Sequence, residues 1–239
     1  MHEFIEAFRF IGRDGSVPGA PGLPSLAHLT LETLKVSAIG VAIAVAIGVP
    51  LGVWLGHRHR GSFVAINLGN VGRALPSLVV LAVGDAFLGL GLTVVELALI
   101  VLAVPPIVTN AYLGVDEVDR DLVDAAKGMG MSGWETITRV ELPLAVPLLF
   151  VGIRTAALFV VSTTTIAALA GFSGSLGDII ANETSYHFSG VLGAAICVAA
   201  LALAVDGVLL LVQRLLTPRG VQLEREARAG SAEAVGATA

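Results

Sequence analysis

The sequence predicts an all-α protein, a polytopic bundle of about five transmembrane helices, and its composition carries this prediction. Of the 239 residues, 55% are hydrophobic, only 14% are charged, and the mean hydropathy is +0.87. Soluble domains carry about 25% charged residues, so the composition argues against a water-soluble globule. The 28 glycines suit helices that approach one another closely in a lipid bilayer. The single cysteine, Cys197, excludes a disulfide framework, and the few basic residues form no patch for nucleic acid.

Charge-free stretches long enough to cross a bilayer indicate where the spans lie. A hydrocarbon core about 30 Å thick requires roughly 20 apolar helical residues. Residues 36–57, 97–115 and 155–177 contain no Asp, Glu, Lys or Arg. The predicted spans are residues 33–56, 62–84, 92–114, 144–171 and 189–213. The second is weaker than the others because Arg73 interrupts it.

The two ends of the chain are expected to lie outside the bundle. We divide the chain into an N-terminal extracytoplasmic segment at 1–27, a transmembrane domain at 28–216 and a disordered cytoplasmic tail at 217–239. The first segment lacks the basic start and apolar core of a cleavable signal peptide. Residues 14–25 within it are rich in Gly and Pro, which predicts an irregular loop. The tail is rich in Ala, Glu and Gly and has too few large apolar residues to fold.

The distribution of Lys and Arg over the loops predicts the orientation. One side of the predicted bundle carries nine basic residues: Arg58, Arg60, Arg120, Lys127, Arg139, Arg214, Arg219, Arg225 and Arg228. The other side carries only Arg9 and Arg13. Because cytoplasmic loops are enriched in Lys and Arg, the N-terminus should be outside and the C-terminus cytoplasmic. An odd number of spans agrees with this arrangement.

The longest loop on the predicted cytoplasmic side, residues 115–143, has the pattern of two short helices. Apolar residues recur there at three- and four-residue steps and predict one apolar face on the first helix: Val118, Leu122, Ala125, Ala126 and Met129. Ser132 and Glu135 have the spacing of a capping box, which predicts that a second helix starts at Ser132 and runs towards Leu142. An amphipathic hairpin lying on the membrane surface would have the same periodicity.

The spacing within this loop resembles a known signature. The loop contains Asp124-Ala125-Ala126, then three residues, Gly130, nine residues and Val140-Glu141-Leu142-Pro143. This pattern is similar to the EAA motif of permease subunits of ATP-binding-cassette importers, with Asp124 in place of Glu and Val140 in place of Ile. The resemblance implies a helical bundle of the type I importer permease kind, whose loop docks in a groove of an ATPase subunit. The residues assigned to this coupling loop are Asp124, Ala125, Ala126, Gly128, Gly130, Trp134, Leu142 and Pro143.

Other segments resemble the osmoprotectant branch of these permeases, whose members move glycine betaine, carnitine, choline and related quaternary amines. These segments are Gly69-Asn70 with Pro76-Ser77-Leu78, Asn110-Ala111-Tyr112 and Gly152-Ile153-Arg154-Thr155-Ala156, and the similarity spans roughly residues 28–215. The branch shows a Gly-Gly-Leu-Gly turn after the fourth span, where this chain has Ser175 at one glycine position.

The resemblance also implies partners and a location. It implies a dimer of ATPase subunits that holds ATP and Mg, a second permease chain, identical or paralogous, and an extracytoplasmic solute-binding protein. The location it implies is the cytoplasmic membrane of a prokaryote, with the chain embedded in the lipid bilayer. We expect this chain itself to bind no cofactor. With only 2 Trp and 2 Tyr it lacks an aromatic cage for a quaternary ammonium, so high-affinity capture is assigned to the binding protein.

Polar side chains inside the spans are candidates for structural pairing or for a solute path. Arg154 and Asp206 are predicted to pair, because charges inside a membrane are costly unless they have a partner. Uncharged groups that offer hydrogen bonds are candidates for the translocation path: Asn70, Ser77, Asn110, Thr163 and Thr164. For each of these the alternative is a hydrogen bond to a carbonyl of its own helix or of a neighbouring helix.

The sequence contains no known catalytic or nucleotide-binding motif. Gly-x-Ser-x-Gly, His-Glu-x-x-His and Gly-x-x-x-x-Gly-Lys-Ser/Thr are all absent, so ATP hydrolysis is expected in a partner chain and no catalytic residue is assigned. His57 and His59 have no Cys or carboxylate cluster beside them in sequence, and we assign them to the basic turn rather than to a metal. Three alternatives stand: an importer permease for amino acids such as methionine, an intramembrane enzyme, and a structural membrane anchor.

Overall fold

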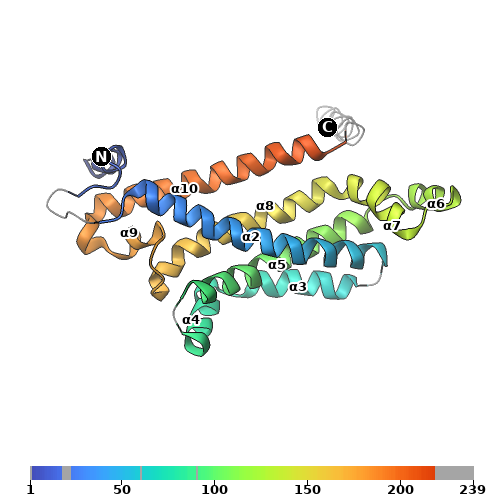
Figure 1. Ribbon diagram of the computed structural model, residues 1–239, viewed down its shortest axis with the longest axis horizontal. Helices are drawn as coiled ribbons and strands as arrows, with labels where there is room; N and C mark the ends of the chain where they lie inside the picture. The colour runs from blue at the N-terminus through green and yellow to red at the C-terminus, as the bar shows by residue number, and fades with distance from the viewer. Residues whose placement is uncertain (1, 18–22, 60, 90, 219–239) are drawn as a thin grey trace, which may run out of the picture.

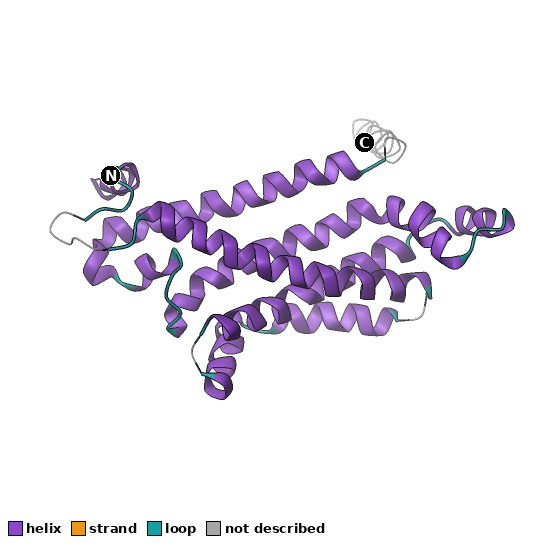
Figure 2. Ribbon diagram, viewed as in Figure 1, coloured by secondary structure: helices purple, strands orange, loops and turns teal. Residues whose placement is uncertain are grey.

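The structure is a computed structural model that describes residues 2–17, 23–59, 61–89 and 91–218. Within these residues every regular element is a helix (Figure 2), so the predicted all-α class is confirmed. Most of the predicted disordered tail, residues 219–239, lies outside the described residues.

The helices pack into an elongated bundle (Figure 1). In chain order the elements are α1 (His2–Gly12), α2 (Leu26–His57), α3 (Ser62–Ala74), α4 (Ser77–Leu88), α5 (Leu92–Asp116), α6 (Arg120–Gly128), α7 (Gly133–Thr136), the π-helix η1 (Ile137–Glu141), α8 (Leu142–Ile166), the 3-10 helix η2 (Ala167–Ala170), α9 (Gly177–Ala181) and α10 (Glu183–Leu216). Among the described residues, α2, α5, the continuous helix 133–170 and α10 are each long and apolar enough to cross a membrane. Three of the five predicted spans lie within these helices, and a fourth, 144–171, extends one residue beyond the helix 133–170.

The predicted span at 62–84 is wrong as a single helix. It consists of α3 and α4, whose axes differ by 86°. The break lies at Leu75 and Pro76, both with extended backbone, at ψ 116° and 124°. Proline restricts the preceding residue to extended conformations and lacks the N–H that would continue the helix. The bent pair counts as a fifth span only if its two halves are taken together.

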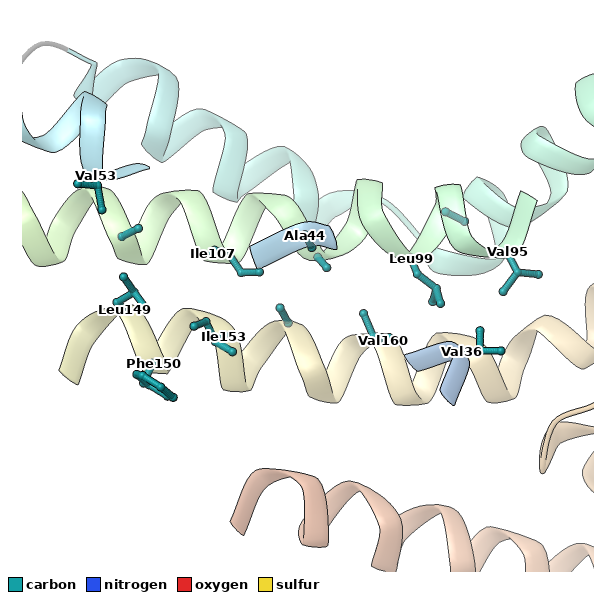
Figure 3. Packing of buried hydrophobic residues seen from close by; sticks show 14 of the residues in the cluster. Val36, Ala44, Val53, Val95, Leu99, Ile107, Leu149, Phe150, Ile153 and Val160 are labelled. Atoms are coloured by element: carbon teal, nitrogen blue, oxygen red, sulfur yellow. The ribbon is translucent and has the colours of Figure 1, made fainter. Parts of the chain in front are cut away.

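Helix α5 is the centre of the bundle and lies between α2 and α8. Leu99 and Ile107 of α5 meet Val36 of α2 and Ile153 and Val160 of α8 in one apolar cluster (Figure 3). In the most apolar part of α5, 61% of the residues are buried, whereas none is buried in the corresponding part of α10. Helix α10 therefore presents most of its surface to lipid or to another protein.

Glycines on α2 allow α5 to approach closely. A Cβ atom at Gly52 would lie 2.6 Å from both the Val108 carbonyl oxygen and the Ala111 Cβ, and one at Gly56 would lie 2.8 Å from the Tyr112 carbonyl oxygen. Real Cβ atoms do not approach other atoms this closely. The two backbones therefore pack at a separation that only glycine permits, as small residues allow in membrane helix pairs.

The segment at 1–27 contains a helix that the sequence reasoning missed. In α1, Ala7 and Phe10 are buried, and the Phe10 ring packs edge-on against Tyr186 of α10 with 6.3 Å between ring centroids. The predicted irregular loop at 14–25 is confirmed for its described residues, 14–17 and 23–25. The N-terminal segment is thus packed on the bundle rather than separate from it.

The predicted pairing of Arg154 and Asp206 is confirmed. Arg154 Nε donates to Asp206 Oδ1 at 2.7 Å, and its Nη2 donates to Oδ2 at 2.8 Å. This two-point geometry is the strongest arrangement between a guanidinium and a carboxylate. It ties α10 to α8, although α10 buries little apolar surface.

Candidate functional site

The first candidate site is the loop between α5 and α8. Helices α6 and α7 project beyond the long helices at one end of the bundle, and α1 and α9 lie towards the opposite end (Figure 1). The described part of the C-terminus runs towards the α6–α7 end (Figure 1). Most of the loop therefore stands outside the apolar part of the bundle.

The predicted capping box at the start of the second loop helix is confirmed. The Ser132 backbone N–H donates to Glu135 Oε2 at 2.9 Å, and the Glu135 N–H donates to Ser132 Oγ at 3.4 Å. The hydrogen bond from the Ser132 backbone lowers the pKa of the Glu135 carboxyl. Because that pKa is lowered, the ionised Glu135 carboxylate contributes to the stability of the folded protein. This contribution is fully present above the ordinary pKa of glutamate and is lost as the pH falls through the lowered value.

The second loop helix continues into α8 without a break, which the sequence reasoning did not foresee. Residues 133–170 form one helix, with a π-helical segment at Ile137–Glu141 that ends two residues before Pro143. Pro143 has no N–H to donate to the Arg139 carbonyl, and a locally widened helix accommodates the missing bond. Helices α7 and α8 are therefore joined by a continuous helical backbone.

The predicted apolar face of the first loop helix is only partly correct. Val118 and Ala126 are buried, together with Val123, which the prediction omitted. Leu122 is 51% exposed and Met129 74% exposed, and Ala125 is exposed as well. The face towards the bundle is thus shifted around α6, which leaves a second set of apolar side chains towards solvent.

The residues assigned to the coupling loop divide between this outer surface and its base. Trp134 is 73% exposed, Asp124 and Ala125 are exposed, and Gly128 and Gly130 have open space where a Cβ would lie. Gly130 has φ +88°, a conformation that favours glycine and turns the chain between α6 and α7. At the base, Ala126 is buried and Leu142 and Pro143 are half-buried.

Two histidines at and just after the end of α2 contact carboxylates at the base of the loop. His57 Nδ1, at the end of α2, lies 2.8 Å from Glu141 Oε2, and only 2% of the glutamate side chain is exposed. His59 Nδ1 lies 2.8 Å from Asp116 Oδ1 at the end of α5. The sequence reasoning missed both contacts, although an acidic residue between Val140 and Leu142 at a span boundary was a signal that Glu141 needs a partner.

The second candidate site is a cavity of about 130 Å³ that is lined from the broken helix α3–α4, from α5 and from α8. Two of the predicted path residues, Ser77 and Thr163, line it together. The sequence reasoning did not assign Arg73 or Phe159 to the path, and both also line this cavity. Only the tertiary structure brings these residues to one place, because α8 and α3 are far apart in the chain.

The other three predicted path residues are not in the cavity lining. The Thr164 hydroxyl donates to the Val160 carbonyl and lies 3.2 Å from Ser37 Oγ of α2, so its contacts are structural. Asn110 Nδ2 donates to the Pro106 carbonyl of its own helix at 2.8 Å. Asn70 is exposed on α3, one helical turn before Arg73.

Comparison with known proteins decides what kind of molecule carries these features. The family model of the binding-protein-dependent transport system inner membrane components matches residues 48–219, which include the loop and the cavity. The chain belongs to this family. It is therefore a multi-pass membrane permease of the ATP-binding-cassette importer kind, a transport subunit.

Curated relatives of the permease cover most of its length. It is 38% identical to the glycine betaine/carnitine/choline transport system permease protein OpuCB of Bacillus subtilis, over 84% of this chain and 93% of the relative. It is 37% identical to the choline transport system permease protein OpuBB of the same organism, over the same shares. The carnitine transport permease protein OpuCB of Listeria monocytogenes is 39% identical over 69% of this chain and 74% of that protein.

Solved structures agree on the fold of the permease. An inward-facing structure of the MetNI methionine ABC transporter matches with a TM-score of 0.69 and 21% identity, over 81% of this chain and 96% of that chain. An amino acid ABC transporter crystallised with histidines gives a TM-score of 0.64 at 21% identity, over 88% of this chain and 97% of that chain. At this level of identity the likeness shows the type I importer permease fold and does not bear on the solute.

Proposed function

We propose that the permease takes up an osmoprotectant such as glycine betaine, choline or carnitine, with ATP hydrolysed by separate subunits docked on the loop 115–143. The observation that carries the substrate class is the 37–38% identity to osmoprotectant permeases over 84% of the chain. The transporters of methionine and other amino acids are similar at 21% only. The complete importer would contain two permease chains, two ATPase subunits that hold ATP and Mg, and a solute-binding protein.

The exposed surface of the loop supports its role as the docking site. Trp134 and Met129 are each more than 70% exposed and contribute little to the folding of this chain. Large exposed apolar side chains on a short helix are typical anchors for a groove on a partner. Once docked, α7 would pass the motion of the ATPase subunits to α8 through the continuous helix.

The basic residues support an orientation with the N-terminus outside and the α6–α7 end in the cytoplasm. Five basic residues within the described part of the chain lie on the predicted cytoplasmic side: Arg58, Arg120, Lys127, Arg139 and Arg214. Reporters fused after Gly61, Gly133 and Gly174 should respond as cytoplasmic, cytoplasmic and external, respectively. Any other order contradicts the proposed orientation.

An uptake measurement with the purified importer tests the proposed function. The permease, its ATPase and its binding protein are reconstituted in proteoliposomes with ATP on the ATPase side. We expect uptake of labelled glycine betaine, carnitine or choline that depends on ATP and on the binding protein, and no uptake of labelled methionine. Uptake of methionine alone would replace this proposal with the amino-acid alternative.

A further inference from the structure

The cavity at the α3–α4 break is open on one side of the single chain, since Arg73 and Phe159 in its lining are exposed. Arg73 and Ser77 line it from either side of the break, and Phe159, Ser162 and Thr163 line it from α8. Arg73 follows Ser62, the first residue of α3, by 11 positions, which is about 16 Å along a helix. Half of a bilayer core about 30 Å thick has nearly the same length. Arg73 is thus separated from the start of α3 by about half the thickness of a bilayer core.

Arg73 is a cation with no oppositely charged partner among the described residues. It makes no hydrogen bond or ion pair with any residue that the structure describes, and its side chain is exposed in the single chain. No Asp or Glu is among the described residues that line the cavity. Because a charged side chain towards lipid is costly, Arg73 must face a water-filled path or another protein. Within the described part of this chain, the cavity lining thus has a positive charge and no carboxylate to neutralise it.

The positive charge of Arg73 favours an anion in the cavity, and the start of α4 adds to this preference. Helix α4 has 12 residues and begins directly after Pro76, with no side chain that caps it. The first N–H groups of a helix lack partners within the helix, and its dipole favours negative charge there. Ser77, the first residue of α4, lines the same cavity as Arg73. A guanidinium, a helix start and a serine hydroxyl are a suitable set of donors for one carboxylate.

Phe159 gives the same cavity an apolar aromatic group. A quaternary ammonium has no N–H to donate, so it is held by the face of an aromatic ring and by apolar contacts. The volume of about 130 Å³ limits the solute to a small molecule, since cavities of about 150 Å³ hold benzene. One ring is a weak site by itself, which suits a solute that must leave again.

We propose that this cavity is a transport subsite for a small zwitterion, with its carboxylate on Arg73 and the start of α4 and its quaternary ammonium against Phe159. The inference rests on the proposed function and narrows its substrate class to solutes such as glycine betaine. Choline has the same trimethylammonium group but a hydroxyl in place of the carboxylate. It would leave Arg73 unneutralised and would be repelled by it, so the permease itself selects against choline.

The test compares glycine betaine with choline in the reconstituted importer at saturating solute. In the wild type, the maximal rate of glycine betaine uptake should exceed that of choline. Arg73→Gln should lower the rate for glycine betaine about tenfold, the effect of a lost hydrogen bond to a charged group, and should raise the rate for choline, because it removes the charge that repels this cation. Phe159→Leu should lower both rates, and Phe159→Tyr should retain both.

Matched variants separate a subsite from a general defect. Arg13→Gln removes the same charge from an exposed position near α1, and Phe87→Leu shortens a side chain that is 84% exposed; both should behave as wild type. If Arg73→Gln does not insert, Arg73→Lys keeps the charge but loses the two-point fork, and it should lower only the rate for glycine betaine.

The outcomes distinguish the two proposals. The zwitterion subsite is overturned if the Arg73 variants affect both solutes equally or affect neither. It is also overturned if the wild type moves choline and not glycine betaine. In each of these cases the proposed osmoprotectant function stands. A wild type that hydrolyses ATP but moves neither solute would instead overturn the proposed function.

Discussion

Trp134→Ala should weaken binding of the ATPase subunits roughly thirtyfold or more and should lower ATP-driven uptake, while the permease still inserts and folds. Trp134 is 73% exposed, so its loss removes little from the packing of this chain. Truncation of a tryptophan that anchors an interface costs about 2 kcal/mol or more, which is about thirtyfold in affinity. The measurement is binding of the purified ATPase to permease in nanodiscs, together with uptake in proteoliposomes.

Leu215→Ala provides the matched control for this variant. Leu215 is 85% exposed at the end of α10, so its truncation also removes an exposed apolar side chain, but from a helix outside the loop 115–143. We expect ATPase binding to the control to equal that of the wild type. If Trp134→Ala binds the ATPase as tightly as this control does, the α6–α7 surface is not the docking site.

Gly52→Leu should prevent stable assembly of the bundle, with a strong loss of folded subunit. A Cβ at this position would lie 2.6 Å from the Val108 carbonyl oxygen, which is backbone and cannot move aside alone. Overpacking a core costs about 1–3 kcal/mol, and a leucine forced between two helix backbones should reach or exceed that range. The yield of monodisperse protein in detergent and its thermal unfolding midpoint measure the effect.

Gly207→Leu is the corresponding control, because no atom lies within 4 Å of a Cβ built at Gly207 on α10. The same residue change there should leave yield and unfolding midpoint close to those of the wild type. Equal losses for the two variants would mean that leucine is tolerated poorly in any span, and that close approach of α2 and α5 is not the reason.

Much of the fold follows from the sequence, because the requirement for a helix to span a membrane is local in the chain. A span needs a sufficient run of apolar residues, and the runs that end at Arg58 and Asp116 mark helices α2 and α5 directly. The capping box at Ser132 and Glu135 also depends only on spacing along the chain. Hydropathy alone, in contrast, did not reveal the break at Pro76, since both α3 and α4 are apolar enough to be read as one span.

The candidate functional residues also fall into two groups, those that the sequence predicted and those that depend on contacts between distant helices. Sequence by itself determined the membrane class, the spans other than the second, the loop 115–143 with its capping box, and the pairing of Arg154 with Asp206. Composition, spacing and the cost of a lone charge are properties of the chain. Only the tertiary structure decided which side of α6 faces outward, that His57 holds Glu141, and that Arg73, Ser77 and Phe159 share one cavity. Those contacts join helices far apart in sequence, and their geometry depends on helix rotation and on the bend at Pro76.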